Sequence, residues 1–264
     1  MELAGKVAVV TGGGNGIGAQ LARRFAAEGA AGVLVADLDG GAAEAVAGQV
    51  RDLGVRASAL AVDVSDEDQV GAMVDAAERE FGPVDVMCSN AGIATGKGIE
   101  ATNAEFDLAW RVNVMAHVYA ARAVVPGMVA RGSGYLLNTC SAAGVLISPG
   151  DAPYNLSKNA AVAFAEYLAV TYGGRGVKVS ALCPQGVQTA LLQDGLDAGN
   201  PAALAVAAAG EVLTVAQVAD CVIEGMAAER FLILPHPEVA KYIGHKAADR
   251  DRWIAGVRRL TADS

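Results

Sequence analysis

Short apolar segments recur along the chain and alternate with segments of helical periodicity. The apolar segments are continuous and rich in Val, Leu and Ala, as in strands buried on both faces of a parallel sheet. They cover residues 7–11, 32–37, 57–62, 84–88, 134–140, 177–183 and 231–234. Residues 19–29 and 66–82 between them have the spacing of amphipathic helices. The alternation predicts one doubly wound α/β domain over residues 1–264, with about seven parallel strands and helices on both faces.

Composition and charge narrow the classes of partner. The chain of 264 residues is 53% hydrophobic and carries a formal net charge of -9, without a cluster of basic residues. Such a surface disfavours binding to nucleic acid or to anionic lipid. The start, "MELAGKVAVVTGGG", lacks the pattern of a signal peptide, and residues 201–219 are predicted to be a loop and a helix rather than a membrane span.

Cysteine and histidine spacing gives no indication of a metal site. The four cysteines (Cys88, Cys140, Cys183, Cys221) have no Cys-x-x-Cys pair, which favours free thiols in a reducing cytoplasm. The three histidines (His117, His236, His245) lack metal-ligand spacing, and we assign them no catalytic role. We expect a cytoplasmic protein without a metal.

A glycine-rich turn follows the first predicted strand. "VVTGGGNGIGAQLARRF" places Gly12, Gly16 and Gly18 between that strand and a helix. Gly12 suits a tight turn, Gly16 allows a phosphate to approach the backbone, and Gly18 allows the helix to pack closely. Free N–H groups at the start of the helix favour an anion, so this turn predicts binding of a dinucleotide pyrophosphate.

The same turn, with "VDVSD", "SNAGIA", "RVNVMA", "NTCSAAG" and "PYNLSK" in that order, resembles the short-chain dehydrogenase/reductase family over nearly the whole chain. The resemblance implies a nicotinamide-dependent enzyme with a catalytic set of Asn113, Ser141, Tyr154 and Lys158. Its implied cofactor-binding residues are Gly12, Asn15, Gly16, Ile17, Gly18, Asp63, Val64, Asn90, Ala91, Gly92, Tyr154, Lys158, Pro184, Val187 and Thr189.

Tyr154 and Lys158 lie one helical turn apart, which puts both side chains on one face of a helix. A free tyrosine titrates near ~10, and a base near neutrality needs about 4 kcal/mol of phenolate stabilisation, for which the Lys158 ammonium is the evident source. The resemblance further implies that Lys158 holds the nicotinamide ribose, Ser141 the substrate oxygen, and Asn113 a water chain. Taken singly, Ser141 could merely end a strand and Asn113 could cap a helix.

Asp37 ends the second predicted strand. A carboxylate there accepts hydrogen bonds from the adenosine ribose and repels a 2′-phosphate, which favours NAD over NADP. Asp39 is a nearby competitor for this role, but it lies beyond the strand and has the position of a loop residue.

At "PQGVQT", Gln185 stands where the family usually has glycine; it could contact the substrate or be a tolerated variant of the turn.

Three segments correspond to the family's substrate cleft: residues 93–98, 142–151 and 190–210, the last within a substrate loop of about residues 187–213. They are largely apolar, and Lys97 is their only cation. A strongly anionic substrate would need a cationic cluster, so we expect a hydrophobic secondary alcohol or ketone, such as a steroid, terpenoid or lipid-derived compound.

The C-terminal extension, about residues 235–264, begins at two prolines and ends in the amphipathic segment "DRDRWIAGVRRL". This helix could pack on its own subunit, or Trp253 and Ile254 could reach a neighbour in the homotetramer that the resemblance implies.

Two alternatives to an NAD-dependent dehydrogenase stay open. One is an NADPH-dependent 3-oxoacyl thioester reductase, which Asp37 and the acidic net charge disfavour, and the other is a non-catalytic nucleotide-binding member of the family.

Overall fold

The computed structural model describes residues 1–208 and 210–262, and in this part of the chain one parallel sheet of seven strands forms the centre. The strand order is β3-β2-β1-β4-β5-β6-β7. The strands are β1 (Val7–Thr11), β2 (Gly32–Asp37), β3 (Arg56–Ala61), β4 (Val86–Ser89), β5 (Gly134–Thr139), β6 (Val177–Leu182) and β7 (Leu232–Ile233). The predicted doubly wound fold is confirmed.

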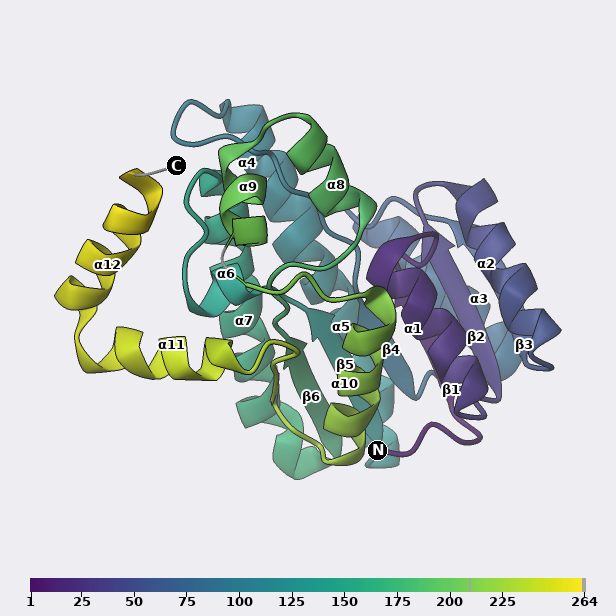
Figure 1. Ribbon diagram of the computed structural model, residues 1–264. Coiled ribbons are helices and arrows are strands. Elements are labelled where there is room, and N and C mark those ends of the chain that lie inside the picture. The colour runs from purple at the N-terminus through teal and green to yellow at the C-terminus, as the bar shows by residue number, and fades with distance from the viewer. Residues whose placement is uncertain (209, 263–264) are drawn as a thin grey trace.

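Helices cover both faces of this sheet (Figure 1). Cluster contacts place α1 (Gly16–Ala27), α2 (Gly40–Asp52) and α10 (Val215–Ala227) on one face. The opposite face is covered by α3 (Glu67–Phe81), α5 (Ala116–Arg131) and α7 (Ala152–Tyr172). Successive residues of β1 enter different layers, Ala8 with the first set and Val9 with the second. Burial on both sides explains why the strands are apolar throughout.

The remaining helices are α4 (Asn103–Trp110), a π-helical turn η1 (Arg111–Met115), α6 (Ala142–Val145), a 3₁₀ turn η2 (Gly173–Arg175), α8 (Ala190–Asp197), α9 (Pro201–Ala208), α11 (Glu238–Ala248) and α12 (Arg250–Ala262). Of these, α4, α8 and α9 lie near the carboxyl end of the sheet, and α11 and α12 extend to one side of it (Figure 1). The segment predicted as a loop and a helix, residues 201–219, holds α9 and the start of α10, two helices, so that prediction is corrected; residue 209 lies outside the described residues.

One helical stretch, Asn103–Arg131, has the length and hydropathy of a membrane span, and half of its most apolar window is buried inside the protein. It comprises α4, η1 and α5, and α5 packs against α3 and β5 in the second layer. These contacts account for its apolar character as a core helix.

The C-terminal extension packs on its own chain. Val239 of α11 is fully buried in a small cluster with Ala142 and Leu146, and Trp253 of α12 packs against it. The Lys246 ammonium donates to the carbonyl oxygens of Val145 and Leu146, at 2.9 and 2.5 Å. These contacts agree with the interpretation that the extension packs on its own subunit. The Ile254 side chain is half exposed.

Candidate active site

The glycine turn between β1 and α1 is closely packed. Gly12 has φ +60°, and a Cβ placed on Gly18 would lie 2.1 Å from the Gly12 carbonyl oxygen, so no larger residue fits there. The first turn of α1 holds no acidic residue. The turn thus has the close backbone approach and the positive helix end that a pyrophosphate requires.

Asn90 and Thr11 hold this turn against the end of β4. The Asn90 side-chain amide donates to the carbonyl oxygens of Thr11 and Gly12 at 3.1 and 3.2 Å, and its oxygen accepts from the Thr139 hydroxyl at 3.0 Å. The Thr11 hydroxyl accepts from the backbone N–H groups of Asn90 and Ala91. The Asn-Ala-Gly segment therefore fixes the phosphate-binding turn relative to the neighbouring strands.

Asp37 and Asp39 have different surroundings. The Asp37 carboxylate accepts from the backbone N–H of Gly14 at 2.9 Å and lines the cleft beside the glycine turn. The Asp39 carboxylate instead accepts from the N–H groups of Gly41 and Ala42 and caps α2. Of the two, Asp37 is the carboxylate that lines the cleft at the end of β2.

One cleft of about 1820 Å³ contains nearly all the residues that the sequence singled out. Ligand pockets usually measure roughly 300–1,000 Å³, so this cleft has room for a dinucleotide and a second molecule. Its lining includes Gly12, Asn15, Gly16, Ile17, Asp37, Asp63, Val64, Asn90, Ala91, Gly92, Ser141, Tyr154, Lys158, Pro184, Val187 and Thr189. Gly18 and Asn113 lie behind this surface, where each supports residues that line it.

Tyr154 and Lys158 occupy the first turns of α7 and face the carboxyl end of β5. The Lys158 ammonium donates to the Thr139 carbonyl oxygen at 3.0 Å and lies 5.7 Å from the centroid of the Tyr154 ring. A Cβ on Gly92 would lie 3.2 Å from the Lys158 nitrogen and 3.2 Å from the Asn113 side-chain oxygen. Glycine at 92 thus leaves room for both polar groups.

Ser141 and Asn113 complete the set, each in a local structure that explains its position. Ser141 is the N-cap of α6, and its oxygen accepts from the Ala143 N–H at 3.1 Å, which leaves its proton free to donate. Asn113 lies in η1. Its side-chain oxygen accepts from the Ile93 N–H, and its side-chain nitrogen donates to the Ile93 carbonyl oxygen and to the Ser157 hydroxyl. The suggestion that Asn113 caps a helix is wrong, because the helix continues through it. Single π turns often occur at functional sites.

Burial controls the ionisation of the central pair. It raises the pKa of the Tyr154 phenol to about 12, with the Asp151 charge adding to the rise and the Ser141 hydroxyl opposing it. Burial lowers the pKa of the Lys158 ammonium below its usual value. Both shifts favour the uncharged form. In the chain by itself, burial therefore sets the direction of the Tyr154 pKa shift, and the lowering of this pKa by Lys158 stays a prediction.

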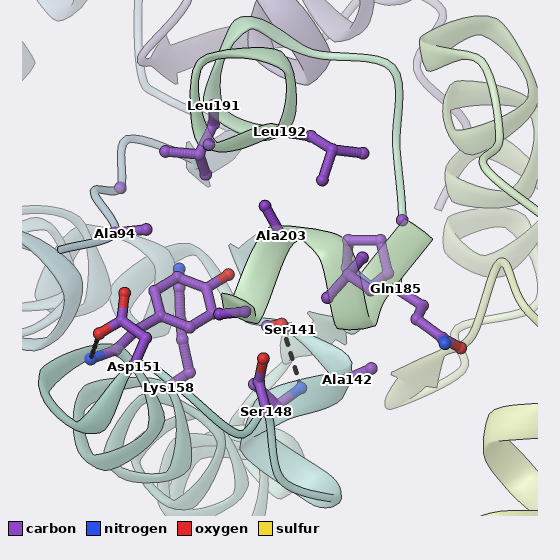
Figure 2. Close-up of a pocket in the computed structure, with 18 of the residues that line it drawn as sticks. Ala94, Ser141, Ala142, Ser148, Asp151, Lys158, Gln185, Leu191, Leu192 and Ala203 are labelled. Atoms are coloured by element: carbon purple, nitrogen blue, oxygen red, sulfur yellow. Dashed lines mark hydrogen bonds between the residues drawn. The ribbon is translucent and has the colours of Figure 1, made fainter. Parts of the chain in front are cut away.

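His236, to which the sequence analysis assigns no catalytic role, holds the turn that carries Gln185. The ring Nδ1 of His236 accepts from the Gln185 backbone N–H at 3.1 Å, and its Nε2 lies 3.1 Å from the Gly186 carbonyl oxygen, to which it donates. Gln185 has no positive φ, so the turn does not require glycine there. Figure 2 shows its side chain directed away from Ser141, which fits a tolerated variant of the turn.

Asp151 is a site residue that the sequence analysis missed. Its buried carboxylate caps α7 through the Tyr154 N–H at 2.9 Å. It also accepts from the Thr95 N–H and hydroxyl, both at 2.8 Å, and from the Gly96 N–H at 2.6 Å. One carboxylate thereby joins the helix of Tyr154 to the loop that follows the Asn-Ala-Gly segment (Figure 2). Only its position just before the helix could have indicated this.

The walls of the cleft around Ser141 are apolar. Leu191, Leu192 and Ala203 face Ser141 across the pocket (Figure 2). Leu146 and Ile147 also line the cleft. These residues belong to two of the three segments predicted to line the cleft, residues 142–151 and 190–210. The Lys97 ammonium pairs instead with the Glu105 carboxylate at 2.6 Å and does not line the cleft.

The C-terminal extension supplies a further wall that the sequence analysis did not predict. Tyr242 and His245 of α11, together with Arg252 and Trp253 of α12, line the same cleft. The Tyr242 and Trp253 rings contact each other, with centroids 6.1 Å apart. Only the folded position of α11 and α12 reveals this role, because an amphipathic pattern does not show which surface a helix covers.

The site combines a glycine turn between a strand and a helix with Ser141, Tyr154 and Lys158. Comparison with known proteins identifies the protein family. Residues 6–198 match the family of short chain dehydrogenases. The chain belongs to the short-chain dehydrogenase/reductase family and is an oxidoreductase with a nicotinamide cofactor.

Three proteins illustrate the similarity. The 1-deoxy-11-beta-hydroxypentalenate dehydrogenase of Streptomyces exfoliatus is 36% identical over 90% of this chain and 86% of its own length. The cis-4-hydroxycyclohexanecarboxylate dehydrogenase of Sinomonas cyclohexanicum is 38% identical over 75% of this chain and 77% of its own. A short chain dehydrogenase/reductase from Burkholderia phymatum, solved in complex with NAD, is 30% identical with a TM-score of 0.87, covering 95% of this chain and 96% of that one.

Proposed function

We propose that the protein transfers hydride between NAD(H) and a hydrophobic secondary alcohol or its ketone. The observation that carries this proposal is the convergence of Ser141, Tyr154 and Lys158 on a cleft that begins at the glycine turn and continues between apolar walls. The reaction needs a cofactor that exchanges the hydride and a side chain that exchanges the proton, close together. A cleft that joins the glycine turn to Tyr154 supports both requirements.

NAD, when bound, supplies the group that accepts the hydride from the alcohol carbon. Ser141 orients the substrate oxygen by hydrogen bonding it, and Tyr154, after its own phenol proton has left past Lys158 toward solvent, takes the hydroxyl proton as the carbon loses its hydride. Lys158, whose ammonium lies near Gly92 and Asn113, would hold a ribose hydroxyl and pass the proton onward; its position near these residues supports this role. In ketone reduction the same residues act in reverse, with the neutral Tyr154 phenol as the proton donor.

The preference for NAD rests on Asp37. Its carboxylate lies at the end of β2 beside the glycine turn, where a ribose 2′-hydroxyl would find an acceptor and a 2′-phosphate would meet a negative charge. The described residues that line the cleft around Asp37 include Leu38, Asp63 and Val64, none of which is cationic. Cytoplasmic location and a homotetramer stay predictions.

The substrate class follows from the walls of the cleft. Leu146, Ile147, Leu191, Leu192 and Leu204 line it near Ser141 or between Ser141 and α12. The two dehydrogenases described above are named for hydroxy compounds, one with a hydroxyl on a cyclohexane ring, which supports a secondary alcohol on an apolar frame.

The experiment is to follow the nicotinamide absorbance with NAD⁺ and with NADP⁺ over a panel of secondary alcohols that runs from short aliphatic to cyclic and steroid compounds. We expect turnover with NAD⁺ and the larger apolar alcohols. A clear preference for NADP⁺ would favour a biosynthetic reductase instead. Cofactor binding without turnover of any member would favour a non-catalytic protein. Turnover of only sugars or polyols would contradict the substrate class.

A further inference from the structure

The far end of the substrate cleft, away from the glycine turn, is cationic. One face of α12 lines the cleft with Arg252, Trp253, Gly256 and Arg259, residues spaced at one and two helical turns. His245 of α11 lies on the same wall. The cleft therefore ends at basic side chains after an apolar stretch. This inference concerns the substrate and rests on the proposed function.

The two guanidinium groups are available to a ligand. No carboxylate of residues 1–208 or 210–262 forms an ion pair with Arg252 or Arg259. Gly256 lies between them on the helix, and a guanidinium nitrogen of Arg259 comes within 4.0 Å of where a Cβ on Gly256 would be. The Arg259 guanidinium thus lies beside Gly256, which is one helical turn from Arg252. Planar guanidinium groups bind a carboxylate through two parallel hydrogen bonds.

The acidic residues near this end do not neutralise the pair. Asp249 also lines the cleft next to Arg252, and its carboxylate accepts from the Arg252 backbone N–H at 2.9 Å at the start of α12. Asp194 lies on α8, a different wall of the cleft. Asp151 is occupied by its four donors near Tyr154.

The position of the pair suits an amphipathic substrate. Arg252 and Arg259 are exposed, so an anion bound there keeps part of its hydration and avoids the cost of a buried charge. An apolar body can at the same time lie between α6, α9 and α12, beside Ala142, Leu146, Leu204 and Trp253. The charged end would thus face outward while the hydroxyl reaches Ser141.

We propose that the substrate is an apolar hydroxy acid whose carboxylate is bound by Arg252 and Arg259 of α12 while its secondary hydroxyl reaches Ser141 and Tyr154. This assigns a specificity role to the C-terminal extension. It also explains how a chain whose predicted cleft segments lack a cationic cluster can accept an anionic substrate, because the cations come from a segment outside that prediction.

The test uses hydroxy acids with a penultimate secondary hydroxyl and a straight apolar spacer of increasing length, together with their methyl esters. With NAD⁺ and the wild-type protein, we expect kcat/KM to favour the acid over its ester most strongly at one spacer length. Arg252→Gln with Arg259→Gln should raise the KM for that acid about tenfold, with little change in kcat and no change for the ester. Arg250→Gln, on the same helix but outside the cleft, is the matched control.

Equal turnover of acid and ester at every length would overturn this inference and leave the proposed function standing. Equal losses for acid and ester in the double variant would also overturn it. If no secondary alcohol is turned over, the proposed function fails, and calorimetric titration of the same acids into NAD-saturated protein decides the inference separately. Binding of an acid that the double variant weakens supports the arginine site, and an absence of binding by every acid contradicts it.

Discussion

Tyr154 and Lys158 meet in a part of the cleft where desolvation dominates their ionisation. In the chain without a cofactor, burial raises the pKa of Tyr154 to about 12. We therefore predict that Tyr154 stays protonated in the free protein throughout the neutral range and up to the ordinary tyrosine value near ~10. Ultraviolet difference titration of wild type against Tyr154→Phe measures this directly. A phenolate that forms near neutrality without cofactor would show that Lys158 overcomes the desolvation.

Asp37 allows a second test at the scale of one residue. Asp37→Asn keeps an oxygen that can accept from the Gly14 N–H but removes the negative charge. The ratio of kcat/KM for NADP⁺ to that for NAD⁺ should rise by about tenfold, equivalent to ~1.4 kcal/mol, because the repulsion of a 2′-phosphate is removed. Steady-state kinetics with both cofactors provide the measurement.

The control for Asp37 is Asp39→Asn. Asp39 lies two residues further along and caps α2, and asparagine can replace that cap. Its cofactor ratio should match the wild type. An unchanged ratio in Asp37→Asn, or an equal change in both variants, would contradict the assigned role of Asp37.

At the scale of elements, Asp151 joins α7 to the loop of residues 93–97. Asp151→Ala leaves four donors without their acceptor, and we predict a loss of about 1–3 kcal/mol in the free energy of unfolding. Because the loop and Tyr154 lose their shared anchor, kcat/KM should fall about tenfold or more. Denaturant unfolding, amide hydrogen exchange at Thr95 and Gly96, and steady-state kinetics measure the three effects.

Asp66→Ala is the matched variant, since Asp66 also caps a helix but lies at the exposed start of α3. It should cost about 1 kcal/mol and leave kcat/KM unchanged. A loss of activity in Asp66→Ala equal to that in Asp151→Ala would mean that general destabilisation, and not the position of Tyr154, explains the effect.

The strands were predictable because each is buried on both faces and hence apolar along its length. β1 and β2 have the predicted bounds, while β3 begins and ends one residue earlier than predicted and β4 begins two residues later. The π turn at Asn113 was not predictable, because it depends on bonds to Ile93 and Ser157 rather than on a local pattern. For the same reason α8 and α9 were predicted only as a substrate loop.

At the scale of the whole molecule, the sequence predicted the family and the lining of the part of the cleft beside the glycine turn, because these depend on glycines and polar residues at strand ends. The other half depends on α11 and α12, whose place is fixed by tertiary contacts such as those of Val239, Trp253 and Lys246. An amphipathic helix pattern shows that a face is covered but does not show what covers it. The arginines of α12 were therefore missed as part of the site.

His117 couples the stability of the molecule to pH. It is fully buried, with Nδ1 donating to the Asn138 oxygen at 3.0 Å, and burial lowers its pKa to about 4. Because the unfolded state takes up a proton near the ordinary value of ~6.5, His117 contributes stability that is lost as the pH falls from there to about 4, up to about 3 kcal/mol. In denaturant unfolding, His117→Gln should show a smaller fall over this range than wild type. Identical falls would contradict the assignment.

The most direct test of the central claim is the rate of NADH formation from an apolar secondary alcohol by wild type and by Tyr154→Phe, with NAD⁺ binding measured in both. Phenylalanine keeps the ring but removes the proton-accepting oxygen, so kcat should fall by about 10²–10⁴-fold while NAD⁺ binding remains close to that of wild type. A variant that retains the wild-type rate would contradict the role of Tyr154 as the acid and base of the reaction.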